Sequence, residues 1–395
     1  MPRLRHALAS PGGTMARSKG TRLPGQPDGP DWLVVTSPLL PEWDDLAPRL
    51  QAILERRWLT NQGADARELE AALVSFLGAP HALLMTNGTL ALEVLVREAV
   101  PGGEVIVPAY SFPATWNLLF DDPRYTPVFV DIGADCNVDP VAVAAAVTPA
   151  TTAVLGVHAY GAPCDRAALE AIAAKHGLAL LFDAAHCAGV RVDGAGVGSW
   201  GDGSAWSFHA TKVFNTLEGG AVTTADATLA DRCRARRSFG QSPEGQVSFG
   251  TNAKMDEFRA AFGLATLPLV ADAITARGAV TDRYDTALDE LPIRRPTWLR
   301  PRPGFEPNHS YYPVFFEDTH DRDRAEAALR EGAVLPRRYF GDDLFTAPAY
   351  AGRVDPGAVP NAARASDTVL CLPVHHRMTN DDVDHVVGLL RRAFS

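Results

Sequence analysis

The stretches LALLFDAAH (178–186) and GSAWSFHATK (203–212) decide the fold. Each begins with a short apolar run typical of a buried strand. Each ends in side chains that can carry chemistry, Asp183 and His186 in the first and Lys212 in the second. Similar apolar runs, several of them separated by amphipathic helical stretches, lie at 81–86, 104–109, 126–131, 151–157 and 219–224. This alternation predicts an α/β fold with a mostly parallel seven-stranded sheet. Helices should cover both faces, and ligands should bind at the carboxyl ends of the strands.

The sequence pattern changes after about residue 255. A long helical stretch leads into a Pro- and Arg-rich segment, a strand-like run HSYYPVFFE (309–317) and further helices. We therefore expect a large domain over 31–265 and a smaller C-terminal α+β domain over 266–395. Residues 1–30 are basic, rich in Pro and Gly, and have no continuous apolar run. They predict a disordered N-terminal extension rather than a signal peptide.

Composition excludes several classes of function. The chain has 395 residues and a net charge of −10 without a long basic run, which argues against nucleic-acid binding. No apolar run approaches the ~20 residues of a bilayer span, so no membrane partner is expected. Five scattered cysteines without CxxC spacing indicate reduced thiols in the cytoplasm rather than disulfides or zinc. The adjacent pair His375 and His376 is poorly spaced for chelation, and we expect no metal.

Lysine is rare in this chain. The 37 basic residues include only four lysines, Lys19, Lys175, Lys212 and Lys254. Lys212 follows a predicted strand and precedes the Gly219-Gly220 turn, so it lies on a loop at a sheet edge. A lysine there can form a Schiff base with a carbonyl, which a guanidinium cannot do. Taken alone, Lys212 is more often explained as a solvated loop lysine.

Three further segments could bind a cofactor. Asp183 closes a buried strand and could balance a protonated pyridine nitrogen, or it could simply cap a helix. The turn Thr86-Asn87-Gly88-Thr89 joins a strand to a helix and could bind phosphate or merely cap that helix. Phe112 follows the strand at 104–109 and could stack on a planar ring or pack in the core.

Together and in this order, these elements resemble the sugar aminotransferases of the DegT/DnrJ/EryC1/StrS family. Those enzymes use pyridoxal 5′-phosphate and have the aspartate-aminotransferase fold type I. The resemblance runs from about Trp58 to the C-terminal LCLPVHHRMT, and SFHATK (207–212) followed by EGG (218–220) is its most specific part. It implies that Lys212 is the Schiff-base lysine and Asp183 the partner of the pyridine nitrogen. It further implies cofactor contacts by Gly88, Thr89 and Ser207 to phosphate, by Phe112 to the ring face, and by His186 near the 3-hydroxyl.

The segment GTNAKM (250–255) is similar to the family's GxNxRM segment. In the family an asparagine there reaches across a dimer interface to the partner's phosphate, which implies this role for Asn252. Lys254 departs from the usual arginine, so a charged contact could persist but a bidentate one could not. The resemblance therefore implies a homodimer with shared active sites.

Within the family, the combination WSFHATK, LEGGAV, TNAKM and RRYF looks most like the subgroup that acts at C4 of a dTDP-4-keto-6-deoxyhexose. The implied reaction moves an amino group from L-glutamate to dTDP-4-keto-6-deoxy-D-glucose and gives dTDP-4-amino-4,6-dideoxy-D-glucose. That subgroup belongs to deoxyaminosugar pathways of antibiotics and other natural products, and of surface polysaccharides. Some relatives carry His in place of the lysine and dehydrate the sugar, so Lys212 favours transamination.

A nucleotide sugar carries a diphosphate, which needs cations at the mouth of its site. Arg337 and Arg338, beside Tyr339, could supply them, and His158 and Tyr160 could line the sugar side. A solvated basic loop over packed aromatic side chains explains the same residues. Other readings also stay open: a different ketosugar aminated at C3, a cyclitol ketone, a dehydration, or a binding protein that keeps the fold without catalysis.

Overall fold

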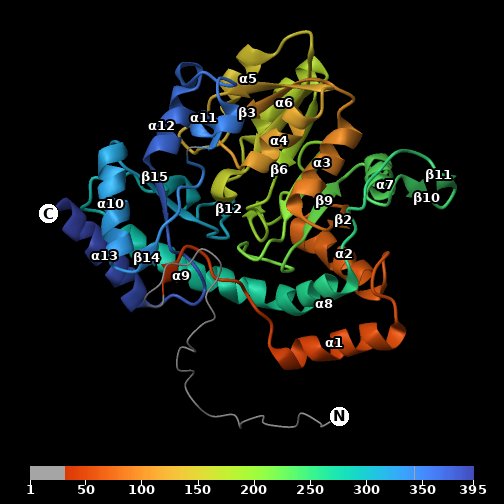
Figure 1. Ribbon diagram of the computed structural model, residues 1–395, viewed down its shortest axis with the longest axis horizontal. Coiled ribbons are helices and arrows are strands. Elements are labelled where there is room, and N and C mark those ends of the chain that lie inside the picture. The colour runs from red at the N-terminus through yellow and green to blue at the C-terminus, as the bar shows by residue number, and fades with distance from the viewer. Residues whose placement is uncertain (1–31, 342) are drawn as a thin grey trace.

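The computed structural model describes residues 32–341 and 343–395, and the predicted N-terminal extension at 1–30 lies outside them. A seven-stranded sheet with the order β2-β9-β8-β6-β5-β3-β4 forms the centre (Figure 1). Its strands are β2 (His81–Met85), β3 (Gly103–Pro108), β4 (Tyr125–Val130), β5 (Thr151–Val157), β6 (Ala179–Asp183), β8 (Gly203–Ser207) and β9 (Gly220–Thr224). Only β9 runs antiparallel to its neighbours. Each of the seven predicted runs forms one of these strands, which confirms the mostly parallel sheet.

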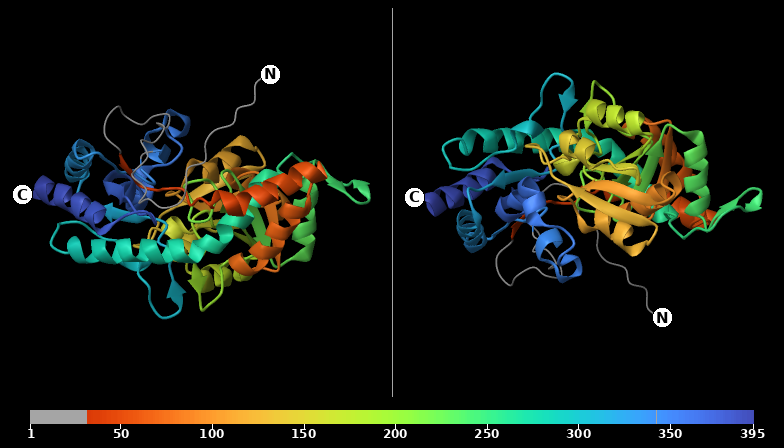
Figure 2. Two further views of the ribbon diagram at one scale, coloured as in Figure 1. Left: turned by 90° about the horizontal axis from the view of Figure 1, so that it is seen from below. Right: turned by 90° about the horizontal axis from the view of Figure 1, so that it is seen from above.

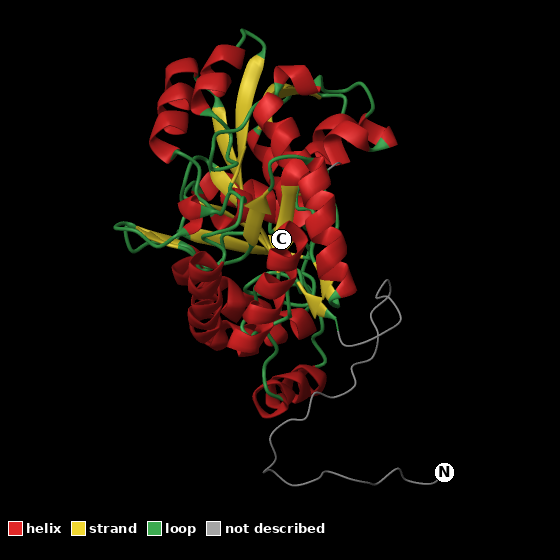
Figure 3. Cartoon of the chain, turned by 90° about the vertical axis from the view of Figure 1, so that its left-hand side faces the viewer, coloured by secondary structure: helices red, strands yellow, loops and turns green. Residues whose placement is uncertain are grey.

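Helices cover both faces of the sheet because its strands are apolar on both sides (Figure 3). One face packs against α3 (Gly88–Ala99), α4 (Pro113–Asp121) and α7 (Ala227–Arg236). The other packs against α2 (Ala64–Leu77), α5 (Pro140–Ala146) and α6 (Arg166–His176). Leu95 and Trp116 belong to the first core, and Leu73 and Leu169 to the second.

The C-terminal part has its own core. β13 (Tyr312–Phe315) pairs antiparallel with β15 (Val369–Leu372), and β1 (Leu33–Val34) pairs parallel with β14 (Val334–Leu335). Buried side chains such as Tyr284, Val314, Leu329, Leu370 and Val386 form this core. They come from β13 and β15 and from α9 (Val270–Ala287), α10 (Thr319–Glu331) and α13 (Asn380–Phe394). This is an α+β arrangement, whereas the predicted division into domains at residue 265 stays a prediction.

The helical segment Glu257–Ala287 is long and apolar enough, by length and composition, to cross a membrane, a feature that inspection of apolar runs missed. It consists of α8 (Glu257–Thr266), a short 3₁₀ turn and α9, and it runs along the molecule (Figure 2). Ala260 and Val270 pack into the core behind the sheet, and Val280 packs into the C-terminal core. Core helices of water-soluble proteins share this composition.

The remaining elements are short or lie at the edges. The hairpin of β10 and β11 projects from the body (Figure 1). The other bounds are α1 (Trp43–Arg56), β7 (Arg191–Val192), β10 (Gln241–Ser242), β11 (Gly245–Gln246), β12 (Phe305–Glu306), α11 (Asp343–Thr346) and α12 (Pro360–Thr368). Short 3₁₀ turns cover Ala159–Gly161, Leu267–Leu269, Thr297–Leu299, Pro348–Tyr350 and Pro356–Ala358.

Candidate active site

A cavity of about 610 Å³ opens at the carboxyl ends of β5, β6 and β8. The strand register sets Val157, Asp183 and Ala205 side by side, so the loops that follow these strands converge. The N-termini of α3 and α4 reach the same place. Ten residues predicted for the site line this cavity: Gly88, Thr89, Phe112, His158, Asp183, His186, Ser207, Lys212, Arg337 and Tyr339. Three do not: Tyr160, Asn252 and Arg338.

Asp183 is held at the end of β6 by two hydrogen bonds. Its Oδ2 accepts from the Thr115 hydroxyl at 2.8 Å, and its Oδ1 accepts from the Ala185 backbone N–H at 3.1 Å. Burial raises the pKa of the Asp183 carboxyl, and these two hydrogen bonds and the nearby Lys212 amine limit that rise. The two hydrogen bonds therefore fix the orientation of the Asp183 carboxyl group at the cavity.

Lys212 lies in the loop after β8, where its backbone N–H closes a turn onto the His209 carbonyl oxygen at 2.9 Å. Burial lowers the pKa of its amine from 10.5 to about 8, and the charge of Asp183 opposes that fall. Its Nζ lies 5.9 Å from the centre of the Tyr311 ring. An appreciable fraction of the amine is therefore neutral just above pH 7, the form that attacks a carbonyl carbon.

The N-terminus of α3 forms a place for an anion. Asn87 caps the helix by accepting from the Leu90 N–H at 2.8 Å. Helix geometry leaves the Gly88 and Thr89 N–H groups without intrahelical acceptors, and both residues line the cavity with Ser207. A Cβ on Gly88 would stand 2.8 Å from the Ser207 Cβ, so only glycine allows this close approach. Two N–H groups and two hydroxyls are thus available to a phosphate.

Aromatic rings form the walls of the cavity. Phe112 precedes the first turn of α4, and about half of its surface is exposed. His186 stacks parallel to Phe340, with ring centres 5.6 Å apart, and its Nδ1 accepts from the Tyr160 N–H at 3.2 Å. Burial lowers the pKa of His186 well below its usual value, so the ring is neutral and carries its proton on Nε2. The wall thus offers an exposed aromatic face and one imidazole donor.

Of the two residues expected on the sugar side, His158 lines the cavity and Tyr160 does not. The His158 ring stacks on Phe182 at 4.7 Å, and its Nδ1 accepts from the Cys164 N–H. Tyr160 lies behind the cavity, where its hydroxyl is 2.6 Å from the Tyr110 hydroxyl and donates to the Tyr339 carbonyl oxygen. The observed contacts of Tyr160 therefore support the cavity wall rather than line it.

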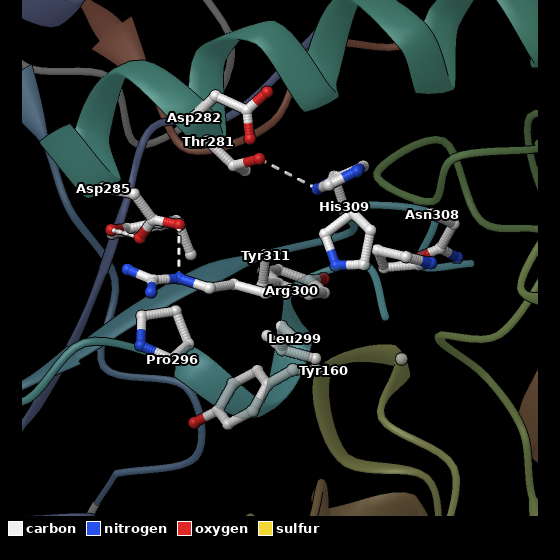
Figure 4. A pocket seen from close by; sticks show the side chains of 14 residues that line it. Tyr160, Thr281, Asp282, Asp285, Pro296, Leu299, Arg300, Asn308, His309 and Tyr311 are labelled. Atoms are coloured by element: carbon white, nitrogen blue, oxygen red, sulfur yellow. Dashed lines mark hydrogen bonds and ion pairs between the residues drawn. The ribbon is translucent and has the colours of Figure 1, made fainter. Parts of the chain in front are cut away.

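Tyr160 borders a second, smaller pocket together with Tyr311 (Figure 4). In that pocket the Thr281 hydroxyl lies 2.9 Å from the His309 Nδ1, and Arg300 pairs with Asp285. Tyr311 also lines the large cavity and so forms a wall between the two.

The two adjacent arginines have different environments. Arg337 lines the cavity, and its guanidinium donates to the Tyr339 hydroxyl at 2.5 Å. Arg338 does not line the cavity, because its guanidinium forms ion pairs with Glu326 at 2.6 Å and Asp323 at 2.8 Å, on α10. The prediction that Arg338 contacts substrate is therefore withdrawn, since these carboxylates hold its charge elsewhere.

Asn252 lies outside the cavity, where its Oδ1 accepts from the Lys254 amine at 2.7 Å. Its predicted role concerns the active site of a second copy of the chain, so its position in one chain leaves that role a prediction.

Sequence reasoning missed Thr115 and Tyr311, although both contact predicted groups. Thr115 lies within the PATW stretch that begins α4, and Tyr311 lies within the predicted run at 309–317. His209 and Glu218 also line the cavity mouth, with the His209 Nε2 3.6 Å from the Glu218 carboxylate. His209 lies within the motif SFHATK and Glu218 within the turn EGG. Their nearness to Lys212 in the sequence was the signal that could have identified them.

Comparison with known proteins places the chain among sugar aminotransferases. Residues 43–391 match the DegT/DnrJ/EryC1/StrS aminotransferase family. A dTDP-4-amino-4,6-dideoxy-D-glucose transaminase of Shigella dysenteriae is 36% identical over 363 residues, which are 91% of this chain and 98% of that protein. A dTDP-3-amino-3,4,6-trideoxy-alpha-D-glucose transaminase of Streptomyces venezuelae is 32% identical over 336 residues, which are 83% of this chain and 87% of that protein.

Solved structures agree with this placement. DesI in the presence of its TDP-sugar product is 38% identical and matches with a TM-score of 0.85, over 93% of this chain and 94% of DesI. The likeness confirms the predicted fold type I, and the match over residues 43–391 confirms the predicted family. This chain belongs to the DegT/DnrJ/EryC1/StrS aminotransferase family and is a pyridoxal 5′-phosphate-dependent aminotransferase.

Proposed function

We propose that this protein transfers an amino group from L-glutamate to C4 of dTDP-4-keto-6-deoxy-D-glucose and forms dTDP-4-amino-4,6-dideoxy-D-glucose. The observation that carries the proposal is the convergence of Lys212, Asp183 and a helix N-terminus on one cavity. The relative named for this transamination, at 36% identity over nearly the whole chain, supports the substrate. DesI, crystallised with a TDP-sugar product, supports the nucleotide.

The residues that line the cavity floor fit pyridoxal 5′-phosphate. The Gly88 and Thr89 N–H groups, with the Ser207 hydroxyl, would hold its phosphate, and Phe112 would cover its ring. The His186 Nε2–H would donate to its 3-oxygen. Asp183 would pair with its ring nitrogen, and Lys212 would bind it covalently through the amine. When bound, the cofactor supplies an electron sink for the bonding pair released at the donor's α-carbon.

Lys212 and Asp183 divide the proton handling. The amine of glutamate would displace Lys212 from the cofactor, and the freed Lys212 Nζ would then take the proton from the α-carbon and give it back after the amino group has moved. Its pKa of about 8 suits this role, because an amine near neutrality both accepts and donates. Asp183 would keep a proton on the ring nitrogen of the bound cofactor, and the Thr115 hydroxyl orients the Asp183 side chain by a hydrogen bond.

The same site must take glutamate and then the nucleotide sugar. Lys212 acts in both half-reactions, and the second reverses the order of proton transfers used in the first. Ping-pong kinetics are therefore expected. We place the reaction in the cytoplasm and in deoxyaminosugar biosynthesis, for an antibiotic or other natural product or for a polysaccharide.

We further propose that the enzyme acts as a homodimer in which Asn252 of each copy contacts the phosphate bound by the other. Large apolar side chains on and beside α1, at Trp43, Leu54 and Trp58, are exposed, as is Phe249 near Asn252. We expect the second copy of the chain to cover these exposed apolar side chains.

The dimer is tested by mixing inactive Lys212→Ala chains with inactive Asn252→Ala chains. In a hybrid dimer one of the two sites has both residues intact, so part of the activity returns. A monomer by light scattering at working concentration would contradict the dimer. Absence of rescue under demonstrated subunit exchange would contradict the shared site.

Amination at C3 is the second candidate, favoured by the 32% identity to a dTDP-3-amino sugar transaminase. One experiment separates the two. The holoenzyme is incubated with glutamate and a panel of dTDP- and UDP-ketosugars, and each product is analysed by mass spectrometry and NMR. An amine at C4 of the dTDP product supports the proposal, whereas an amine at C3 supports the second candidate. Turnover of a cyclitol ketone alone would refute both.

A further inference from the structure

Arg337 lacks an acidic partner among the residues that the structure describes. Its guanidinium donates to the Tyr339 hydroxyl, and its central carbon lies 5.5 Å from the Tyr339 ring centre. Both contacts are with a neutral group, so neither cancels the charge. Arg338 shows the alternative, because Glu326 and Asp323 neutralise its guanidinium. The sequence gives the two arginines the same side chain, but only Arg337 brings an uncompensated charge to the cavity.

The backbone holds Arg337 firmly at the cavity mouth. Arg337 and Cys371 exchange two backbone hydrogen bonds, at 2.7 and 3.3 Å, which tie this segment to β15. The Tyr339 ring in turn lies 5.4 Å from the ring of Tyr311, over which the Lys212 amine sits at 5.9 Å. Lys212 and Arg337 therefore line the same cavity, with the rings of Tyr311 and Tyr339 between them.

The proposed function requires one site that binds two different anionic substrates in turn. Glutamate brings two carboxylates, and the nucleotide sugar brings a diphosphate, and each must leave before the other enters. Lys212 is engaged in the chemistry, which leaves Arg337 as the arginine that lines the cavity within residues 32–341 and 343–395 and is available to an anion. A guanidinium can donate two parallel hydrogen bonds to either group in the same bidentate geometry.

We infer that Arg337 is the common anion anchor of both half-reactions. It binds a carboxylate of the amino donor in the first and the diphosphate of the nucleotide sugar in the second. The Tyr339 hydroxyl acts as a positioning group that aims the guanidinium. This inference rests on the proposed function and adds a consequence to it: the two substrates cannot be bound at the same time.

The test uses two unreactive probes on the holoenzyme. Glutarate is a dicarboxylate without an amine, and dTDP is a nucleoside diphosphate without a sugar carbonyl. Their dissociation constants are measured by calorimetry for the wild type, for Arg337→Gln, and for the matched control Arg338→Gln. We expect Arg337→Gln to weaken both probes about tenfold or more, and Arg338→Gln to change neither more than about twofold. Glutarate should raise the apparent dissociation constant of dTDP competitively.

Several outcomes would overturn the anchor. They are simultaneous binding of the two probes, weakening of only one probe by Arg337→Gln, or equal effects of the two substitutions. If circular dichroism shows that Arg337→Gln does not fold, Arg337→Lys serves instead. This variant keeps the positive charge but loses the two parallel N–H donors of the guanidinium. It should weaken both probes by the same smaller factor, and unequal factors would refute the anchor.

The test also separates the anchor from the proposed function. If both probes compete and depend on Arg337 but no dTDP-ketosugar is aminated, the anchor stands and the substrate assignment fails. If the C4 amine is formed by an enzyme that binds both probes together, the proposed function stands and the anchor fails.

Discussion

The floor of the cavity is built from strand ends and a helix N-terminus, whereas its mouth is built from loops. On the floor, burial raises the pKa of Asp183 and lowers those of Lys212 and His186. At the mouth, Arg337 and Glu218 are exposed. Low exposure to water strengthens each electrostatic interaction on the floor, whereas charges at the mouth are screened by solvent. We therefore expect chemistry on the floor and substrate capture at the mouth.

The largest effect on the floor should follow Lys212→Ala. The substitution removes both the covalent attachment and the group that moves the proton, so turnover should be lost. Borohydride reduction and peptide mapping of the wild type should find the cofactor on Lys212. Lys175→Ala, in the last turn of α6, is the matched control and should stay active. Label on Lys175 or Lys254 would contradict the assignment.

Asp183→Asn should leave the cofactor bound and lower kcat by at least about 100-fold. An amide of the same shape cannot hold a positive charge on the ring nitrogen, so the electron sink weakens. The visible spectrum of the bound cofactor measures occupancy, and single-turnover kinetics measure the rate. A variant that transaminates at the wild-type rate would reduce Asp183 to a structural cap.

The pH dependence of cofactor capture tests the burial of Lys212. Because its pKa falls from 10.5 to about 8, the neutral amine forms above about pH 8. The neutral fraction then rises from about one tenth at pH 7 to about nine tenths at pH 9. The rate at which cofactor-free protein takes up pyridoxal 5′-phosphate should therefore rise about tenfold over this interval. A rate that rises about 100-fold over this interval and levels off only above about pH 10.5 would indicate an ordinary exposed lysine.

The smallest effect should follow Thr115→Val, which keeps the shape of the side chain but loses the hydrogen bond to Asp183. A lost hydrogen bond of about 1 kcal/mol corresponds to a roughly fivefold lower kcat. Thr115→Ser, which keeps the hydroxyl, is the control and should stay near the wild type. Equal losses in both variants would indicate a packing effect rather than support of the carboxylate.

Local sequence was sufficient for the sheet and for the groups at strand ends. Apolar runs bounded by helical stretches identified the seven strands, because alternation of this kind is a local pattern. Asp183 could be singled out because it closes such a run, and Lys212 because it lies in the loop after one, since parallel strands bring their carboxyl ends to one edge. Gly88 was recognisable in the same way, at the start of a helix.

Only the tertiary structure decided the contacts between distant segments. It showed that Arg337 and Arg338 have different surroundings, although they are adjacent in the sequence. The carboxylates that pair with Arg338 come from α10, and the sequence around the two arginines does not show which of them α10 contacts. It placed Tyr160 behind the wall and brought Thr115 to Asp183, 68 positions away in the chain. Such contacts depend on how helices and loops pack around the sheet, and local pattern carries no record of that packing.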